Sequence, residues 1–302
     1  MQLTSRSPDF THTITCEHLW VHGWENPSWV VDELSRRPIL HPKQGKVEKR
    51  NDKEVHNDDC KEILASISLL KACTRTKDIC KGSKLHADIL KIDFLEKSPY
   101  LASTLINMYA KCGTLTKAQE VLESLLNRDT VSWNALISGF SLQEKYDEAI
   151  TCFELMQIEG LSPDVVTFIS ILKVCGRRLD IVMGKRIHDE IASKGLVGKG
   201  IVLGSALVDM YAKCGFLVKA QQVLEELPVR NVVSWSSLIS GCVQRGLNDD
   251  ALYCFERMQN EGLSPDAITF TCVLKACGST KEVEKGRKIH DEIMNQGLLH
   301  DD

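Results

Sequence analysis

The chain has 302 residues, of which 43% are hydrophobic and 26% charged, and its formal net charge is −4 at pH 7. That hydrophobic content is enough for a continuous buried core, and the few glycines and prolines exclude a collagen-like or generally disordered chain. The negative charge argues against tight nonspecific binding to phosphates, although a locally neutral or basic surface can still bind bases.

The first 62 residues carry no repeated pattern. Residues 1–15 are rich in Ser and Thr with one Arg and one acidic residue, so they match an Arg-rich, acid-poor organelle transit peptide only in part. Trp20, Trp24 and Trp29 indicate a short docking segment or a poorly ordered leader. The charged stretch His41–Asp59 predicts a flexible linker. We expect residues 1–62 to form a leader and linker, with a transit peptide or a disordered segment as the alternatives.

From Ile63 onward the sequence repeats at an interval of 102 residues. The hexapeptide M-Y-A-K-C-G at 108–113 returns letter for letter at 210–215, and Trp133 and His86 also have counterparts one interval later. A fixed period over most of a chain is the signature of a repeat architecture. The interval divides into units of 36, 31 and 35 residues, which predicts seven motifs at 63–98, 99–129, 130–164, 165–200, 201–231, 232–266 and 267–302.

Each motif carries two amphipathic helical patterns. In Thr130–Asp164 the first helix has apolar residues at i, i+3, i+4 and i+7, namely Trp133, Leu136, Ile137 and Phe140. A second helix opens at Lys145 and Tyr146, and Gly160 and Pro163 mark its end. No helix pair buries its apolar face alone, so neighbours must stack into a solenoid, whose hand the residues leave open. We predict an all-α fold, a right-handed α-solenoid superhelix of stacked helix-turn-helix repeats.

The sequence offers no catalytic, metal or cofactor site. His188 and His290 begin H-x-E, half of the zinc-deaminase pattern, but the chain contains no C-x-x-C, so we interpret them as structural histidines of second helices. Gly82 and Gly184 recur at the repeat interval and are interpreted as turn glycines rather than a phosphate loop. Repeat-spaced cysteines indicate buried apolar positions in a reducing compartment. No apolar run has the length of a membrane span, so we expect no membrane partner.

The stretches V-S-W-N-A-L-I-S-G-F (131–140) and E-A-I-T-C-F-E-L-M-Q-I-E-G-L-S-P-D (148–164), with both M-Y-A-K-C-G copies, resemble a pentatricopeptide repeat protein. The alternating motif lengths resemble the plant PLS subclass, and the resemblance covers about four-fifths of the chain. Tetratricopeptide repeats keep a 34-residue period and a W-x2-L-G-x2-Y signature, which this chain lacks. Because the last motif ends at Asp302, we expect the E and DYW-type extensions of editing proteins to be absent.

The resemblance implies binding of single-stranded RNA in mitochondria or chloroplasts, one base per motif, through the fifth and last residues of each motif. Aspartate accepts hydrogen bonds from guanine or uracil, whereas asparagine also donates, which suits adenine. The implied pairs are Ser103 with Asp129 for guanine, Asn134 with Asp164 for uracil, Ser205 with Asn231 for adenine, and Ser236 with Asp266 for guanine.

The central footprint expected from these pairs is 5′-GUNAG-3′. The 36-residue motifs have apolar fifth residues, Ile67 and Ile169, and are expected to specify no base, while Thr271 with Asp302 looks more like a reading pair. The resemblance also implies that the second residues sandwich bases, namely Tyr100, Val131, Val202 and Val233. Lys111 and Lys213 either contact phosphates or cap helix C-termini.

These features predict a sequence-selective single-stranded-RNA adaptor without catalysis, acting in organellar RNA processing. The preferred role is recognition of C-to-U editing sites, with a deaminase supplied in trans. A protein-interaction scaffold is one alternative, because helical solenoids also offer long surfaces to peptides. A truncated, non-functional relative is the other.

Overall fold

The computed structural model describes residues 52–92, 95 and 98–297. Most of the expected leader, including its three tryptophans, and the terminal Asp302 lie outside the described residues. All of the described residues belong to one compact unit. The described part contains no helix long and apolar enough to cross a membrane.

The described residues form fourteen helices and no strand, arranged as seven helical hairpins. The first helices of the hairpins are α2 (Asp52–Thr76), α4 (Pro99–Lys111), α6 (Thr130–Leu142), α8 (Val165–Arg178), α10 (Ile201–Lys213), α12 (Val232–Gln244) and α14 (Ala267–Thr280). The second helices are α3 (Ile79–Lys91), α5 (Leu115–Ser124), α7 (Tyr146–Ile158), α9 (Ile181–Ser193), α11 (Leu217–Glu226), α13 (Asn248–Asn260) and α15 (Val283–Asn295).

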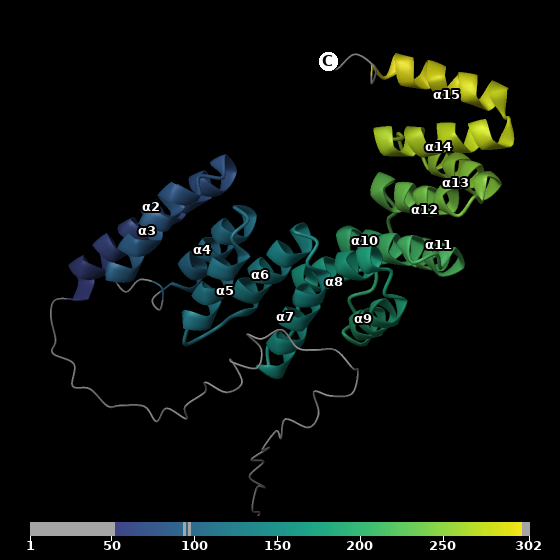
Figure 1. Ribbon diagram of the computed structural model, residues 1–302. Helices are drawn as coiled ribbons and strands as arrows, with labels where there is room; N and C mark the ends of the chain where they lie inside the picture. Colours follow the sequence, from purple (N-terminus) through teal and green to yellow (C-terminus); the bar gives the residue numbers. More distant parts are fainter. Residues whose placement is uncertain (1–51, 93–94, 96–97, 298–302) are drawn as a thin grey trace, which may run out of the picture. The chain divides into compact units, whose positions relative to one another are not determined.

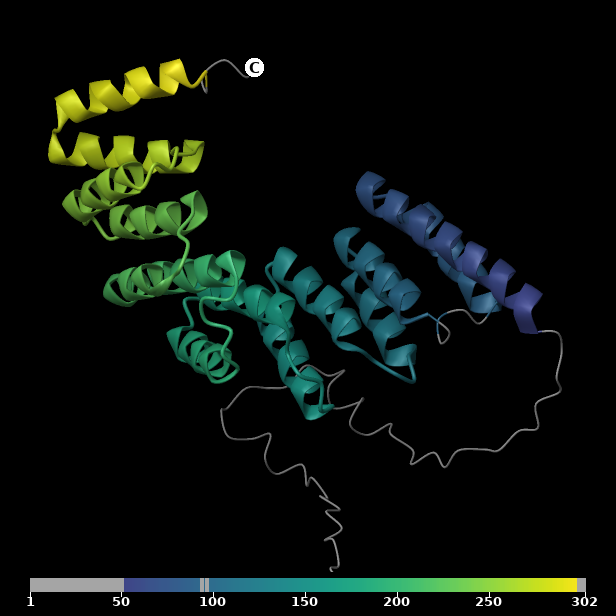
Figure 2. The same ribbon diagram turned by 180° about the vertical axis from the view of Figure 1, so that it is seen from behind.

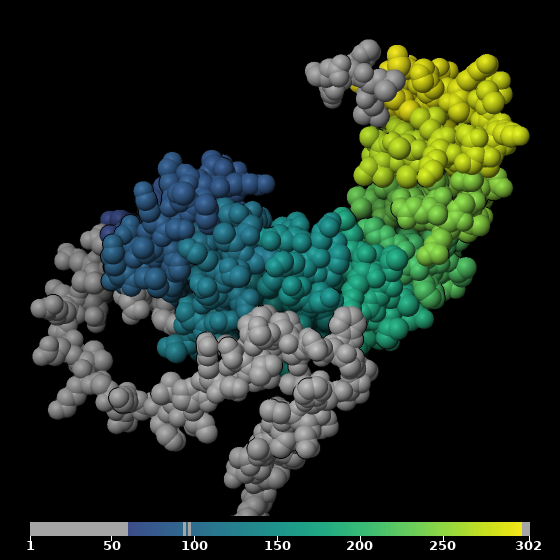
Figure 3. All heavy atoms as spheres, in the orientation of Figure 1, coloured from purple at the N-terminus to yellow at the C-terminus, as the bar shows by residue number. Residues whose placement is uncertain are grey.

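The hairpins stack in chain order (Figures 1 and 2). Each first helix contacts the first helix of the next hairpin, so α2, α4, α6, α8, α10, α12 and α14 form one continuous row. Each second helix packs on its own first helix, and every second helix before α15 also packs on the first helix of the following motif. Figure 3 shows that the atoms of the array pack without a break from its purple end to its yellow end. The predicted all-α solenoid of stacked hairpins is confirmed.

The core consists of the stripes that the helical periodicity predicts. In α6, Trp133, Leu136, Ile137 and Phe140 are all at most 3% exposed. No single hairpin buries them, because they lie between their own second helix and the neighbouring first helices. Gly113 and Gly160 follow α4 and α7 with φ values of +91° and +80°, a conformation that terminates a helix and costs glycine little.

Six of the seven predicted motif starts, from Pro99 to Ala267, are first residues of helices, but the first motif differs. Helix α2 begins at Asp52, inside the stretch His41–Asp59 that we predicted to be a linker, and ahead of the predicted start at Ile63. Charged composition suggested disorder, but Asp, Lys and Glu extend a helix at small cost once a buried segment has nucleated it.

The interpretation of Gly82 and Gly184 as turn glycines is also wrong. Both lie inside second helices, α3 and α9, rather than before them. A Cβ at either position would overlap with the side chain of Met108 or Met210 from the following motif. Glycine therefore permits close packing between motifs at these positions.

Candidate nucleic-acid interface

The last residue of each of the first six motifs is the N-cap of the next first helix. The Oδ1 atoms of Asp129, Asp164 and Asp266 accept hydrogen bonds from the backbone N–H groups of Ser132, Thr167 and Thr269, each at 2.8 Å. Asn231 Oδ1 accepts from the backbone N–H of Ser234 at the same distance. Such caps satisfy one of the N–H groups that a helix N-terminus leaves without an intrahelical partner. The predicted last-position residues therefore also set where the helices begin.

Two of the predicted pairs are in direct contact. Asn134 Nδ2 donates to Asp164 Oδ1 over 3.0 Å. Ser205 Oγ lies 3.1 Å from Asn231 Oδ1, and its hydroxyl is shared between that oxygen and the Ile201 carbonyl of its own helix at 2.8 Å. These contacts join the fifth residue of one motif to the cap of the next first helix. The structure thus brings the fifth and last residues together at these two motif junctions.

The other two serines bond within their own helices. Ser103 Oγ donates to the carbonyl of Tyr100 over 3.1 Å, and Ser236 Oγ donates to that of Val232 over 2.7 Å. All four fifth-position residues are at most 6% exposed. The last residues Asp129, Asn231 and Asp266 are half-buried and Asp164 is exposed, so the Asp or Asn of each pair is more accessible than the fifth residue.

Capping fixes which end of the last residue is available to a ligand. A backbone N–H forms a hydrogen bond only with an acceptor, so Oδ1 points toward the helix. The second terminal atom of the side chain does not take part in the cap. That atom is an acceptor, Oδ2, in Asp129, Asp164 and Asp266, but a donor, Nδ2, in Asn231. If the Asn231 amide were rotated by 180°, its NH2 group would face the Ser234 N–H, and two donors cannot form a hydrogen bond with each other. The three Asp junctions therefore offer an acceptor and the Asn junction offers a donor.

Thr167 organises the junction between the third and fourth motifs. Its Oγ1 donates to Asn134 Oδ1 over 2.7 Å and lies 2.9 Å from Asp164 Oδ1. The Asn134 amide is thereby oriented with Nδ2 toward Asp164, and Thr167 itself is fully buried. Asp164 Oδ2 and the second Nδ2 hydrogen of Asn134 remain, so an acceptor lies beside a donor at this junction.

A row of exposed apolar side chains accompanies these junctions. Tyr100, Val131, Val202 and Val233 are 52–65% exposed, and each is the second residue of a first helix. The same second position in the remaining motifs is also exposed and apolar, and we define the apolar row as Leu64, Tyr100, Val131, Val166, Val202, Val233 and Ile268. The three members not predicted could have been found by applying the second-position rule to every motif.

The two predicted lysines differ in their surroundings. Lys213 Nζ lies 2.6 Å from Asp209 Oδ2 on the same helix, so its charge is already paired. Lys111 is exposed in the last turn of α4, and Asn107 occupies the position that corresponds to Asp209. Lys111 is therefore the better candidate for a phosphate contact.

His86 and His188 hold the tyrosine of the hexapeptide in the next motif. Each Nδ1 lies 2.9 Å from a tyrosine hydroxyl, that of Tyr109 or Tyr211. Burial lowers the pKa of both histidines, and Lys117 and Lys219 add to the effect. These contacts give the two histidines a structural role between motifs.

Comparison with known proteins agrees with the repeat architecture. The model of the PPR repeat family matches residues 128–177 and 230–279, and a PPR repeat model matches 101–129, 205–232 and 268–298. A chloroplastic pentatricopeptide repeat-containing protein of Arabidopsis thaliana is 35% identical over 223 residues, which cover 74% of this chain and 36% of that protein. A mitochondrial one from the same plant is 34% identical over 231 residues, covering 76% of this chain and 22% of that protein.

Solved structures show the same fold. The pentatricopeptide repeat protein PPR10, in complex with an 18-nt psaJ RNA element, superposes with a TM-score of 0.66 at 22% identity, covering 81% of this chain and 38% of that one. PPR10 from maize superposes with a TM-score of 0.54 at 19% identity, covering 77% and 39%. The chain spans well under half the length of these relatives.

Proposed function

The chain belongs to the pentatricopeptide repeat family, and from that premise we propose that it is a sequence-selective single-stranded-RNA adaptor in organellar RNA processing. The names of its relatives place them in chloroplasts or mitochondria, and PPR10 is named in complex with RNA. The observation that carries the proposal is the row of helix-capping Asp and Asn residues beside exposed apolar side chains.

In this mechanism the RNA lies along the first helices with its bases unstacked. The apolar row sandwiches the bases, a contact that tolerates any sequence because every base has a π-face. The terminal side-chain atom of each capping residue that does not bond to the helix then forms a hydrogen bond with the Watson–Crick edge of its base. Acceptors at Asp129, Asp164 and Asp266 select imino donors, and the donor at Asn231 selects a ring-nitrogen acceptor.

The footprint that follows is 5′-GUNAG-3′, with guanine, uracil, adenine and guanine at the second, third, fifth and sixth motifs. The fourth motif is the unspecified position, because its fifth residue is Ile169 and its last residue, Gly200, has no side chain to present. The alternation of 36, 31 and 35 residues supports the PLS subclass. Within that subclass we propose editing-site recognition, with the deaminase supplied by a partner.

Titration of the full chain with fluorescent RNA tests the proposal. A single-stranded oligonucleotide carrying 5′-GUNAG-3′ in an unstructured context should bind more tightly than a scrambled oligonucleotide of the same composition. About 1 kcal/mol per specified base over four bases predicts a preference of several hundredfold. Equal affinities for the two oligonucleotides would contradict sequence selection, and no binding to either would contradict the RNA-binding function itself.

A further inference from the structure

The first helices from the second motif onward form a locally basic row. Helices α4, α6, α8, α10, α12 and α14 contain a single acidic residue, Asp209, and it is paired with Lys213. The same helices carry six basic residues, namely Lys111, Lys173, Arg177, Arg178, Lys213 and Lys275. The capping Asp residues precede these helices, and the other acidic residues between 99 and 297 belong to second helices and loops. Local charge, rather than the net charge of −4, governs the attraction of a polyanion.

Three lysines recur at the repeat interval of 102 residues. Lys71, Lys173 and Lys275 are each the ninth residue of a 36-residue motif, and all three are exposed. We define them as the lysine row. Each follows its motif's member of the apolar row by seven residues, which is close to two helical turns. The two side chains therefore lie on one face of the helix, about 10 Å apart along its axis.

Contacts of two ninth residues show where this position points. Lys71 Nζ donates to the hydroxyl of Tyr100 over 2.8 Å and lies 5.1 Å from the centre of its ring. Tyr100 belongs to the apolar row of the next motif. Ser138, the ninth residue of the third motif, has its Oγ 3.2 Å from that of Ser170 in the fourth motif. The ninth position thus faces the following motif, on the side of the first helices that carries the apolar row.

The charges of Lys173 and Lys275 are not offset by a neighbour. Within the described residues, neither ammonium group forms an ion pair or a hydrogen bond. Lys71 bonds only to a neutral hydroxyl. The equivalent residue is serine in both 35-residue motifs and Asn or Asp in the 31-residue motifs, so the lysine is specific to the 36-residue motifs.

We propose that Lys71, Lys173 and Lys275 bind phosphates of the RNA backbone, so that the 36-residue motifs hold the strand while the other motifs select bases. This inference rests on the proposed RNA-binding function and adds the ligand group that these motifs recognise. An ammonium group is a compact charge with three donors, which suits phosphate oxygens. Because the ninth position faces the following motif, Lys173 binds the phosphate that joins N to A in 5′-GUNAG-3′.

Neutralising that one phosphate tests the contact of Lys173. The probe is fluorescent RNA carrying 5′-GUNAG-3′, with an uncharged methylphosphonate between N and A. All probes share 2′-O-methyl groups on U and N, which protect the uncharged linkage from cleavage. The unmodified chain should bind this RNA roughly threefold more weakly than the all-phosphate RNA, because one ion pair is lost. The Lys173→Gln chain should bind the two RNAs equally.

A methylphosphonate between U and N is the matched control, because the third motif has Ser138 at its ninth position. This linkage should change the affinities of the unmodified and Lys173→Gln chains by the same factor. If the linkage between N and A also weakens both chains by the same factor, Lys173 does not bind that phosphate and the proposal is wrong.

Salt dependence tests the lysine row with RNA long enough to reach the seventh motif. In a chain carrying Lys173→Gln and Lys275→Gln, the slope of log affinity against log salt concentration should become shallower by about 0.7 for each lysine, the value for contacts to single strands. The loss of affinity should be equal for 5′-GUNAG-3′ and scrambled RNA, because phosphates carry no sequence information.

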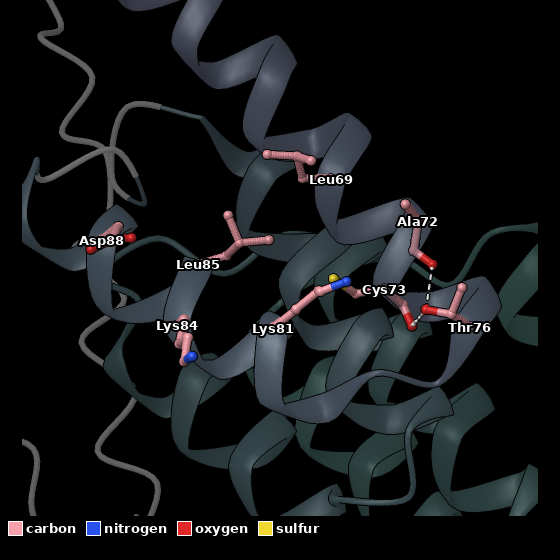
Figure 4. Close-up of a pocket in the computed structure, with 8 residues that line it drawn as sticks. All are labelled: Leu69, Ala72, Cys73, Thr76, Lys81, Lys84, Leu85 and Asp88. Carbon is pink, nitrogen blue, oxygen red and sulfur yellow. Dashed lines mark hydrogen bonds between the residues drawn. The ribbon is translucent and has the colours of Figure 1, made fainter.

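A chain carrying Lys84→Gln and Lys288→Gln is the matched control, because it loses the same charge from exposed positions on second helices. Figure 4 shows Lys84 on α3, beside a pocket that α3 forms with α2. Leu69 and Cys73 line this pocket and lie on a different face of α2 from Lys71. The control chain should keep the salt slope of the unmodified chain.

Equal changes of slope in the two double variants would indicate a general charge effect and overturn the proposal. A preference for 5′-GUNAG-3′ together with an unchanged slope in the Lys173→Gln, Lys275→Gln chain would overturn the lysine row and leave the proposed function standing. Absence of RNA binding by the unmodified chain would contradict both.

Discussion

Asn134 Nδ2 donates to Asp164 Oδ1 over 3.0 Å, and that same carboxylate oxygen caps helix α8 through the Thr167 backbone N–H. Asp164 Oδ1, at the end of the third motif, therefore contacts both the fifth residue of that motif and the first helix of the fourth motif. Folding and base selection depend on different ends of the same side chain. Substitutions that keep the cap but change the free atom separate the two roles.

Asn231→Asp makes that separation at the fifth motif. Asp and Asn are equally good N-caps, so the thermal midpoint should stay unchanged. The free atom changes from a donor to an acceptor, so preference at this position should shift from adenine toward guanine by roughly fivefold. Competition binding with four oligonucleotides that differ at that base measures the shift.

Asn231→Ala serves as the companion variant. It removes the cap as well as the free atom, so it should lower the unfolding free energy by about 1 kcal/mol and abolish the base preference. An unchanged preference for adenine in either variant would show that Asn231 does not select the base.

Thr167 gives a second prediction, because it acts on the base only through Asn134 and Asp164. Thr167→Val removes the hydroxyl while keeping the shape, and leaves the Asn134 Oδ1 atom without its 2.7 Å donor. We expect a loss of about 1 kcal/mol in unfolding free energy and reduced discrimination between uracil and cytosine.

Thr167→Ser retains the hydroxyl and should preserve the discrimination. The quantity to compare is the ratio of affinities for uracil- and cytosine-bearing oligonucleotides, which a purely structural role of Thr167 would not alter. If that ratio is the same in Thr167→Val and in the unmodified chain, the positioning role is wrong.

The starts of six of the seven first helices were predictable because the sequence marks them with residues suited to a helix N-terminus. Capping residues such as Asp129 and Asn231 precede the helices, and Gly113 follows one, so the apolar periodicity had fixed limits. The orientation of the Asn134 amide was not predictable, because Thr167 comes from the next motif and approaches only after stacking. The ion pair of Lys213 with Asp209 was visible at i, i+4 spacing, whereas the early start of α2 contradicted its charged composition.

The apolar row gives a third prediction. Val202 is 65% exposed, so Val202→Asp should leave the thermal midpoint nearly unchanged while weakening RNA binding about fivefold through lost stacking and repulsion of phosphates. The weakening should be the same for 5′-GUNAG-3′ and scrambled RNA, because stacking carries no sequence preference.

Val218→Asp is the matched control for the row. Val218 is 74% exposed on the second helix α11, so it adds the same charge at a similar exposure but away from the motif junctions. Its RNA affinity should remain close to that of the unmodified chain. Equal losses in the two variants would indicate a general charge effect and not a contact by the row.

The histidine–tyrosine contacts give a pH prediction. Burial lowers the pKa of His86 and His188 below the ordinary value of 6.5, so the unfolded chain binds these protons more readily than the folded one. Stability from the neutral histidines is complete above that ordinary value and is lost as the pH falls through it toward the folded pKa. The thermal midpoint should therefore decrease between pH 7.5 and pH 5.

In a chain carrying His86→Gln and His188→Gln the decrease should be smaller, because glutamine can still bond to Tyr109 and Tyr211 but does not titrate. Parallel pH profiles for the two chains would mean that other groups cause the decrease.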